Sequence, residues 1–194
     1  MSLDPLREFG RRACRHLDSF SRVCSILEEI METNPRITVD SRDIAGRLTL
    51  SGVFDPPKGS VEIDGIEVSW EVHGGFVTII GVTKSEETGL PSNISATFYR
   101  DSVMLSVEPD LTVVLDPGAR AITFWRGTHL ATIRCTPRID VTASGYLDPD
   151  QLAKLRKVLP EITEAVEKLS NIIDDVLSVA KTMASLIKLA RLLP

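Results

Sequence analysis

The stretch SVEIDGIEVSWEVHGGFVTIIGV, residues 60–82, decides the fold of this chain. Asp64-Gly65 is a strong signal for a two-residue hairpin turn, and Gly74-Gly75 can turn a second hairpin. Both turns place one set of apolar residues on the same face of the strands. These are Val61, Ile63, Ile66, Val68, Trp70, Val72, Val77 and Ile79. A slip of one residue would scramble that face, so the agreement of two independent turns predicts a three-stranded antiparallel meander.

The alternation of apolar and polar residues continues on both sides of the meander, over residues 36–147. Turn signals recur along this region, at Arg100-Asp101, at 116–119 and at Arg126-Gly127. They predict about nine to eleven short strands, which are too many for one flat sheet. We therefore expect an antiparallel β domain with a curved sheet, built as a meander, a partial barrel or a sandwich. In the last long strand, His129 is expected to share an apolar stripe with Ala131 and Ile133.

Residues 1–35 are predicted to form an N-terminal amphipathic helix, from about Asp4 to Glu32. Asp4 can cap this helix and Pro5 suits its first position, while Asn34-Pro35 ends it. Apolar residues recur with alternating spacings of four and three, which is typical of a heptad seam. They are Ala13, Leu17, Phe20, Cys24, Leu27 and Met31.

Residues 148–194 are predicted to form a longer C-terminal helix that starts at Asp148-Pro149 and has a kink or a restart near Pro160. Its apolar residues alternate in spacing between three and four without a phase break. They are Leu152, Leu155, Leu159, Ile162, Val166, Leu169, Ile173, Val176, Ala180, Met183, Ile187 and Ala190. The predicted fold class is therefore α+β, with a curved antiparallel sheet flanked by a long N-terminal helix and a longer C-terminal one. The two helices are expected to form an antiparallel pair, to cover the sheet, or to pack with another subunit.

The composition argues against several classes of function. A net charge of −5 argues against nucleic-acid binding. Cys14, Cys24 and Cys135 contain no CxxC pair and are interpreted as reduced thiols, which favours a cytoplasmic location. No signal peptide is evident, and no charge-free run is long enough to span a membrane. The scarcity of Asn and Gln hints at a thermophilic source.

No catalytic, cofactor or metal site is predicted. The three histidines, His16, His73 and His129, are scattered, with no nucleophile in a recognisable arrangement beside them. No HxxxH or CxxC pair suggests a metal, and no glycine-rich loop suggests a bound phosphate. We therefore expect no cofactor, and the chain is more consistent with a non-enzyme.

The C-terminal helix carries the main functional hypothesis, which is a non-catalytic assembly or interaction protein. Such a protein would form a homo-oligomer or bind a protein partner through its helical seams, and its β domain would present a surface to a partner. The expected interface residues are Leu159, Ile162, Val166, Leu169, Ile173, Val176, Met183 and Ile187. A peripheral location is also open, because Lys181, Lys188 and Arg191 could contact an anionic membrane surface.

The alternative hypothesis is a protein that binds an apolar, lipid-like ligand between the curved sheet and the long helix. The expected lining consists of Trp70, Ile79, Phe98, Val113 and Phe124. The simpler interpretation of the same residues is that they fill the core.

Overall fold

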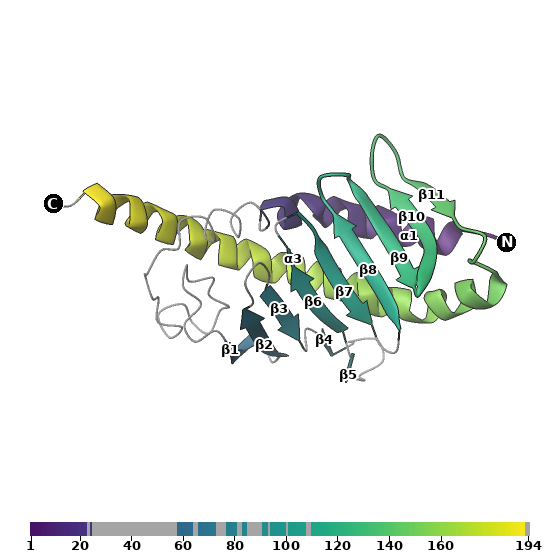
Figure 1. Cartoon of the computed structure of the whole chain (residues 1–194), viewed down its shortest axis with the longest axis horizontal. Helices are drawn as coiled ribbons and strands as arrows, with labels where there is room; N and C mark the ends of the chain where they lie inside the picture. Colours follow the sequence, from purple (N-terminus) through teal and green to yellow (C-terminus); the bar gives the residue numbers. More distant parts are fainter. Residues whose placement is uncertain are drawn as a thin grey trace.

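The main sheet is an antiparallel meander in the computed structural model (Figure 1). The structure describes the backbone of residues 1–22, 24, 58–63, 66–72, 77–80, 83–84, 91–92, 94–99, 101–107 and 110–192. Side chains are described for 1–22, 24, 94–99, 101–107 and 110–171. The strands are β1 (Lys58–Ile63), β2 (Ile66–Val72), β3 (Val77–Ile80), β4 (Thr83–Lys84), β5 (Pro91–Ser92), β6 (Ile94–Phe98), β7 (Val103–Val107), β8 (Leu111–Asp116), β9 (Ala121–Arg126), β10 (Thr128–Arg134) and β11 (Asp140–Ala143).

Nine of these strands form a sheet in the order β1-β2-β3-β6-β7-β8-β9-β10-β11, while β4 and β5 pair separately. The sheet is open, since β1 and β11 are its two edges, so the expected antiparallel sheet is confirmed in its meander form. The predicted registers are also confirmed: Val61 pairs with Val68, and Trp70 pairs with Ile79.

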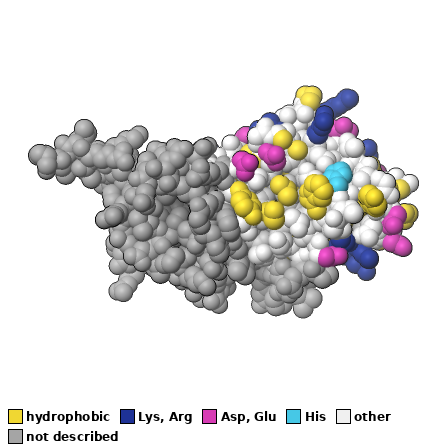
Figure 2. All heavy atoms as spheres, in the orientation of Figure 1, with side chains coloured by type: hydrophobic (Ala, Val, Ile, Leu, Met, Phe, Trp, Pro, Cys, Tyr) yellow, Lys and Arg dark blue, Asp and Glu magenta, His cyan; other side chains and the backbone are white. Residues whose placement is uncertain are grey.

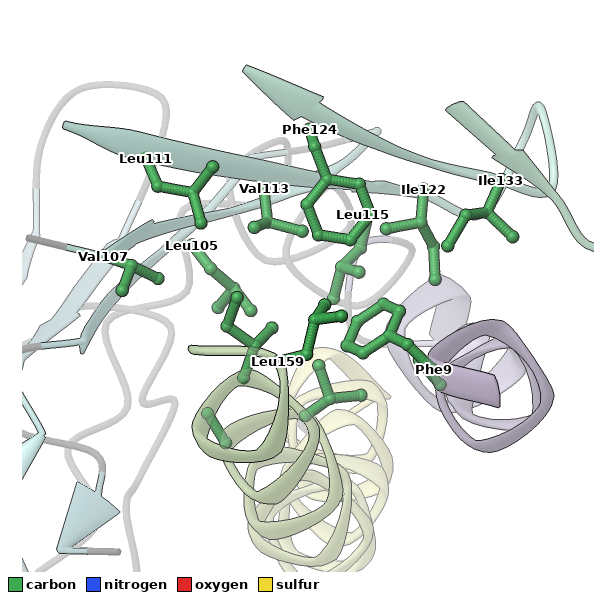
Figure 3. Close-up of a cluster of buried hydrophobic side chains, with 14 of the residues drawn as sticks. Phe9, Leu105, Val107, Leu111, Val113, Leu115, Ile122, Phe124, Ile133 and Leu159 are labelled. Carbon is green, nitrogen blue, oxygen red and sulfur yellow. The ribbon is translucent and has the colours of Figure 1, made fainter. Parts of the chain in front are cut away.

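The inward side chains of β6 to β10 form the hydrophobic core (Figure 3). Alternate residues along β6, β7, β8 and β9 are buried, as an antiparallel sheet with one covered face requires. Figure 3 shows Phe9 and Leu159 approaching this face from two helices. The ring of Phe9 meets that of Phe124 edge to face, with 5.4 Å between the ring centroids. The core therefore lies between one layer of strands and one layer of helices.

The expectation for His129 is wrong, because a β-bulge interrupts the pairing of β10 with β9. His129 pairs with Trp125 and Ala131 pairs with Phe124, which leaves Leu130 as the extra residue. Leu130 and Ala131 are both buried, whereas His129 is only partly buried and turns to the opposite face. The bulge shifts the alternation by one position, as bulges do.

The N-terminal helix begins as expected but is not uniform. Helix α1 (Asp4–Ala13) is followed by a 3-10 turn, η1 (Cys14–His16), and helical backbone resumes over 17–22. Leu3, and not Asp4, is the N-cap residue, so the helix starts at Asp4, one position earlier than the predicted cap requires. The predicted seam residues Ala13, Leu17, Phe20 and Cys24 are all buried. Leu27 and Met31 lie outside the described residues.

The C-terminal helix α3 (Pro149–Leu192) is one element of 44 residues. Its start is as predicted, because the carboxylate of Asp148 accepts a hydrogen bond from the backbone N–H of Gln151 at 2.8 Å. The helix runs on through Pro160, whose ring is exposed, so the predicted restart at this proline does not occur. A proline on the outer face removes one backbone hydrogen bond without ending the helix.

Helices α1 and α3 cover the same face of the sheet and run parallel, so the expectation of an antiparallel pair is wrong (Figure 1). Arg12 forms an ion pair with Glu167 at 2.9 Å, and His16 Nδ1 lies 3.1 Å from Ser170 Oγ. Positions therefore increase together along both helices. The reason is topological: α1 packs against β10 and β11, and α3 starts directly after β11, so both helices begin at the same edge of the sheet.

The interpretation of all three cysteines as reduced is also wrong. Cys14 and Cys135 form a disulfide that joins η1 to the connection between β10 and β11, with 5.5 Å between the two Cα atoms. Their separation in sequence is 121 residues, so only the packing of α1 on the end of the sheet brings them together. Cys24 is the free cysteine, and it is buried.

Candidate interaction surfaces

Two potentially reactive side chains of the described residues, Ser170 and Cys24, are buried. The described residues contain no group of three or more His, Cys, Asp or Glu side chains that could hold a metal ion. His16 and Ser170 lie at the distance of a base and a nucleophile, but Ser170 is only 3% exposed between two helices, where no substrate could reach it. Burial raises the pKa of the Cys24 thiol to about 11, which keeps it protonated and unreactive.

The predicted interface residues of α3 divide into two groups. Leu159, Ile162, Val166 and Leu169 are at most 6% exposed and pack in the chain's own core. They hold α3 on the sheet and on α1, so a partner cannot contact them in the folded chain. The other four are Ile173, Val176, Met183 and Ile187, whose side chains lie outside the described residues. The backbone that carries them remains helical to Leu192.

Helix α3 is longer than the sheet that it covers. Its 44 residues reach about 66 Å at the usual helical rise. Nine strands span about 38 Å at the usual strand spacing. Figure 1 shows the C-terminal end of α3 extending beyond β1, the last strand on that side. We name residues 172–192 the α3 extension.

The residues expected to line an apolar ligand site are placed as follows. Phe98, Val113 and Phe124 are at most 2% exposed and belong to the core between the sheet and the helices. Trp70 and Ile79 are paired between β2 and β3, but their side chains lie outside the described residues. The three described side chains therefore fill the core, as the simpler interpretation predicts.

The face of the sheet that points away from the helices carries a row of uncharged side chains. Successive strand pairings align Thr97, Met104, Val114, Thr123, Thr132 and Thr142 across β6 to β11. We name this row, together with Trp125 and His129, the outer sheet face. Figure 2 shows a row of hydrophobic side chains and a histidine across the middle of the described part of this face, with most charged side chains towards its margins.

Trp125 and His129 form the most exposed aromatic part of the outer sheet face. Trp125 is 42% exposed, and its ring lies edge to face with His129 at 5.2 Å between the ring centroids. His129 Nε2 lies 2.8 Å from Thr132 Oγ1, which fixes the orientation of the imidazole. Sequence reasoning missed this pair, although a signal was available: Trp125 and His129 stand at equal distances on either side of the turn glycine Gly127.

A partly buried arginine, Arg126, supports the strand end that carries Trp125. Arg126 forms an ion pair with Asp110, with 2.9 Å between Nε and the carboxylate oxygen, and its Nη1 donates a hydrogen bond to Gln151 Oε1 at 3.0 Å. Its side chain is only 11% exposed. These contacts tie β9 to the start of β8 and to the first turn of α3, so Trp125 is displayed on a rigid support.

Within the part of the chain that the structure describes, no helix is both long and apolar enough to cross a membrane. Comparisons with protein-family models, with curated proteins and with solved structures found no match to this chain.

Proposed function

We propose that this chain is a non-catalytic assembly protein that self-associates through the α3 extension and presents its outer sheet face to a protein partner. The observation that carries the proposal is the length of α3, which continues as a helix well past the sheet that covers its first half.

The apolar residues in the first half of α3 pack in the chain's own core, because the buried positions run from Leu152 to Leu169. The sequence repeats the same spacing in the α3 extension, at Ile173, Val176, Ala180, Met183, Ile187 and Ala190. An apolar stripe of this length is stable in water only when another surface covers it. A second copy of the same helix supplies such a surface.

The outer sheet face has the composition of an interaction surface. Interface centres are depleted in charged residues and enriched in aromatic ones, and exposed tryptophans often contribute a large part of the binding energy. Trp125 meets this description, because it is exposed while its neighbours Arg126 and His129 hold its strand end in place.

The experiment compares two matched double variants of the full chain by light scattering coupled to size exclusion. Val176→Glu with Met183→Glu adds two charges to the apolar stripe, whereas Ser178→Glu with Ser185→Glu adds the same charges off the stripe. We expect the first variant to have the monomer mass of 21.3 kDa and the second to keep the larger mass of the unmodified chain. The proposal is wrong if the unmodified chain is a monomer, or if both variants keep its larger mass.

Binding to an anionic membrane through Lys181, Lys188 and Arg191 is the competing role of the α3 extension. Cosedimentation with vesicles that contain phosphatidylserine distinguishes the two. Self-association predicts that the chain stays in the supernatant, and membrane binding predicts that it pellets in low salt and is released by high salt.

A further inference from the structure

The outer sheet face carries an apolar and aromatic strip that crosses four neighbouring strands. Its members are Met104 on β7, Val114 on β8, Trp125 on β9 and His129 on β10. Met104 pairs directly with Val114, and Trp125 pairs directly with His129. Val114 and Trp125 are diagonal neighbours, because Val114 pairs with the residue two positions before Trp125. We name these four residues the cross-strand strip.

The positions beside the cross-strand strip carry hydroxyl groups and no charge. They are Thr97, Ser106, Thr112, Thr123 and Thr132. Charged side chains stand at one end of these strands instead, where Asp116, Arg134 and Asp140 fall in one row of the pairing. The strip therefore offers apolar contact together with neutral hydrogen-bonding groups.

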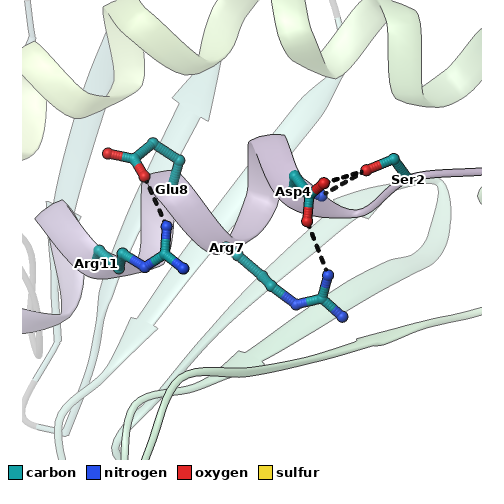
Figure 4. Close-up of polar contacts among 5 residues, drawn as sticks. All are labelled: Ser2, Asp4, Arg7, Glu8 and Arg11. Carbon is teal, nitrogen blue, oxygen red and sulfur yellow. Dashed lines mark hydrogen bonds and ion pairs between the residues drawn. The ribbon is translucent and has the colours of Figure 1, made fainter.

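The helical side of the molecule has a different character. On α1, Arg7 forms an ion pair with Asp4 at 3.0 Å, and Arg11 pairs with Glu8 at 2.9 Å (Figure 4). Both carboxylates are well exposed, at 80% and 65%. A neutral partner would cover these charges without pairing them, which costs free energy. The outer sheet face is therefore the side of the molecule that suits an uncharged ligand.

The spacing of the strands sets a repeat for a ligand that crosses them. Two strands apart, as β7 and β9 are, means about 9.6 Å at the usual strand spacing. A polyproline II segment has three residues per turn and brings a residue to the same side every ~9.3 Å. An extended β-strand does so every ~6.8 Å. A polyproline II segment across the sheet thus places one residue over Trp125 and the third residue after it beside Met104 and Ser106.

We propose that the cross-strand strip binds a proline-rich segment of the partner protein in the polyproline II conformation. This inference rests on the proposed function, since it names the kind of protein segment that the outer sheet face would bind. Charge matching supports it, because a run of prolines is uncharged and meets no charged side chain in the strip. Aromatic surfaces recognise such segments by packing their rings on proline rings. Trp125 supplies the ring, and it is 42% exposed.

Hydrogen bonding supports the same ligand. A polyproline II segment has no internal hydrogen bonds, so its backbone carbonyl groups are free to accept them. The indole N–H of Trp125 and the hydroxyl groups of Ser106 and Thr112 are donors of the required kind. Both partners are also ordered before they meet, because proline fixes the backbone of the ligand and Arg126 holds the strand end that carries Trp125.

Fluorescence anisotropy of a dye-labelled decaproline peptide, titrated with the full chain, tests the inference. We expect saturable binding with a Kd on the order of 100 µM, as for a small transient interface. A Gly-Ser decamer with the same dye has no rings to pack and no fixed backbone, so it should not bind over the same range.

Two variants and a matched control locate the binding surface. Trp125→Ala should weaken binding at least tenfold, because it removes the ring. Ser106→Glu should weaken it about fivefold, because it puts an unpaired charge beside the ligand at a position that is already exposed. Asn171→Glu adds the same charge to an exposed position of α3, on the other side of the sheet, and should leave binding unchanged. Circular dichroism checks that each variant is folded.

The inference is overturned if decaproline binds no better than the Gly-Ser peptide, or if Ser106→Glu binds it as tightly as the unmodified chain does. Cellohexaose, a neutral sugar that can also stack on an exposed tryptophan, should not displace the peptide, and displacement would overturn the preference for proline. The mass measurements that test the proposed function do not involve the strip. A failure here therefore leaves self-association through the α3 extension standing, whereas a monomeric chain that binds decaproline would overturn only the self-association.

Discussion

Removal of the disulfide between Cys14 and Cys135 gives a prediction whose size follows from the topology. The bond closes a loop of 121 residues, and chain-entropy arguments assign such a loop about 4.9 kcal/mol of stabilisation. The entropy of unfolding of a 194-residue chain is about 0.41 kcal/mol per kelvin. Dividing the first value by the second predicts that loss of the bond lowers Tm by about 12 °C.

The assay is thermal unfolding followed by circular dichroism for Cys14→Ser, Cys135→Ser and the double variant. Each single change breaks the same bond, so the three variants should lose nearly the same Tm, and the two single losses should not add. A reducing agent should lower the Tm of the unmodified chain by a similar amount and leave the double variant unchanged. A loss below about 3 °C, or two single losses that add, would refute the reasoning, because the loop would then not be closed in the folded chain.

Three further substitutions or treatments test local packing. Gly10→Ala should lower the free energy of unfolding by about 1 kcal/mol, because a Cβ atom there would lie 2.9 Å from a methyl carbon of Ile133. This loss should outweigh the better helix propensity of alanine, and an unchanged or higher Tm would contradict the packing. Cys24 should not react with iodoacetamide in the native chain, because burial raises its pKa to about 11. Denaturant without a reductant should expose one reactive thiol per chain. Labelling of the native chain, or labelling of more than one thiol after denaturation, would contradict this expectation. Asp148→Ala should lower the stability by about 1 kcal/mol through loss of the hydrogen bond to the N–H of Gln151, measured by urea denaturation, and a change near zero would show that this cap is dispensable.

The sequence predicted the strand registers because they depend on local signals. Asp64-Gly65 is a local signal for a two-residue turn, and the alternation of apolar side chains then predicts which residues pair. The start of α3 at Asp148-Pro149 was predicted for the same reason, since an N-cap acts within one turn.

The parts that the sequence did not predict depend on contacts between distant segments or on a local interruption of the alternation. The bulge at Leu130 shifts the pattern by one residue, and nothing in the residues themselves marks where the shift falls. The parallel course of α1 and α3 follows from the position of β11 at the sheet edge, which only the complete strand order defines. The bond between Cys14 and Cys135 depends on that same arrangement.

The candidate surfaces show the same division. The spacing of apolar residues in α3 predicted a buried stripe, and Leu159 and Ile162 are indeed buried. Spacing cannot tell which surface covers a stripe, however, because a chain's own sheet and a partner present the same apolar environment. The described side chains show that the first half of the stripe, from Leu152 to Leu169, is buried within the chain, and the proposal for the α3 extension rests on a helix that is longer than the sheet is wide.

The central claim is that protein surface from another copy covers the α3 extension. Sedimentation equilibrium of the unmodified chain, across the micromolar range, measures this most directly. We expect an average mass that rises above 21.3 kDa as concentration increases. A mass that stays at 21.3 kDa at every concentration would contradict it.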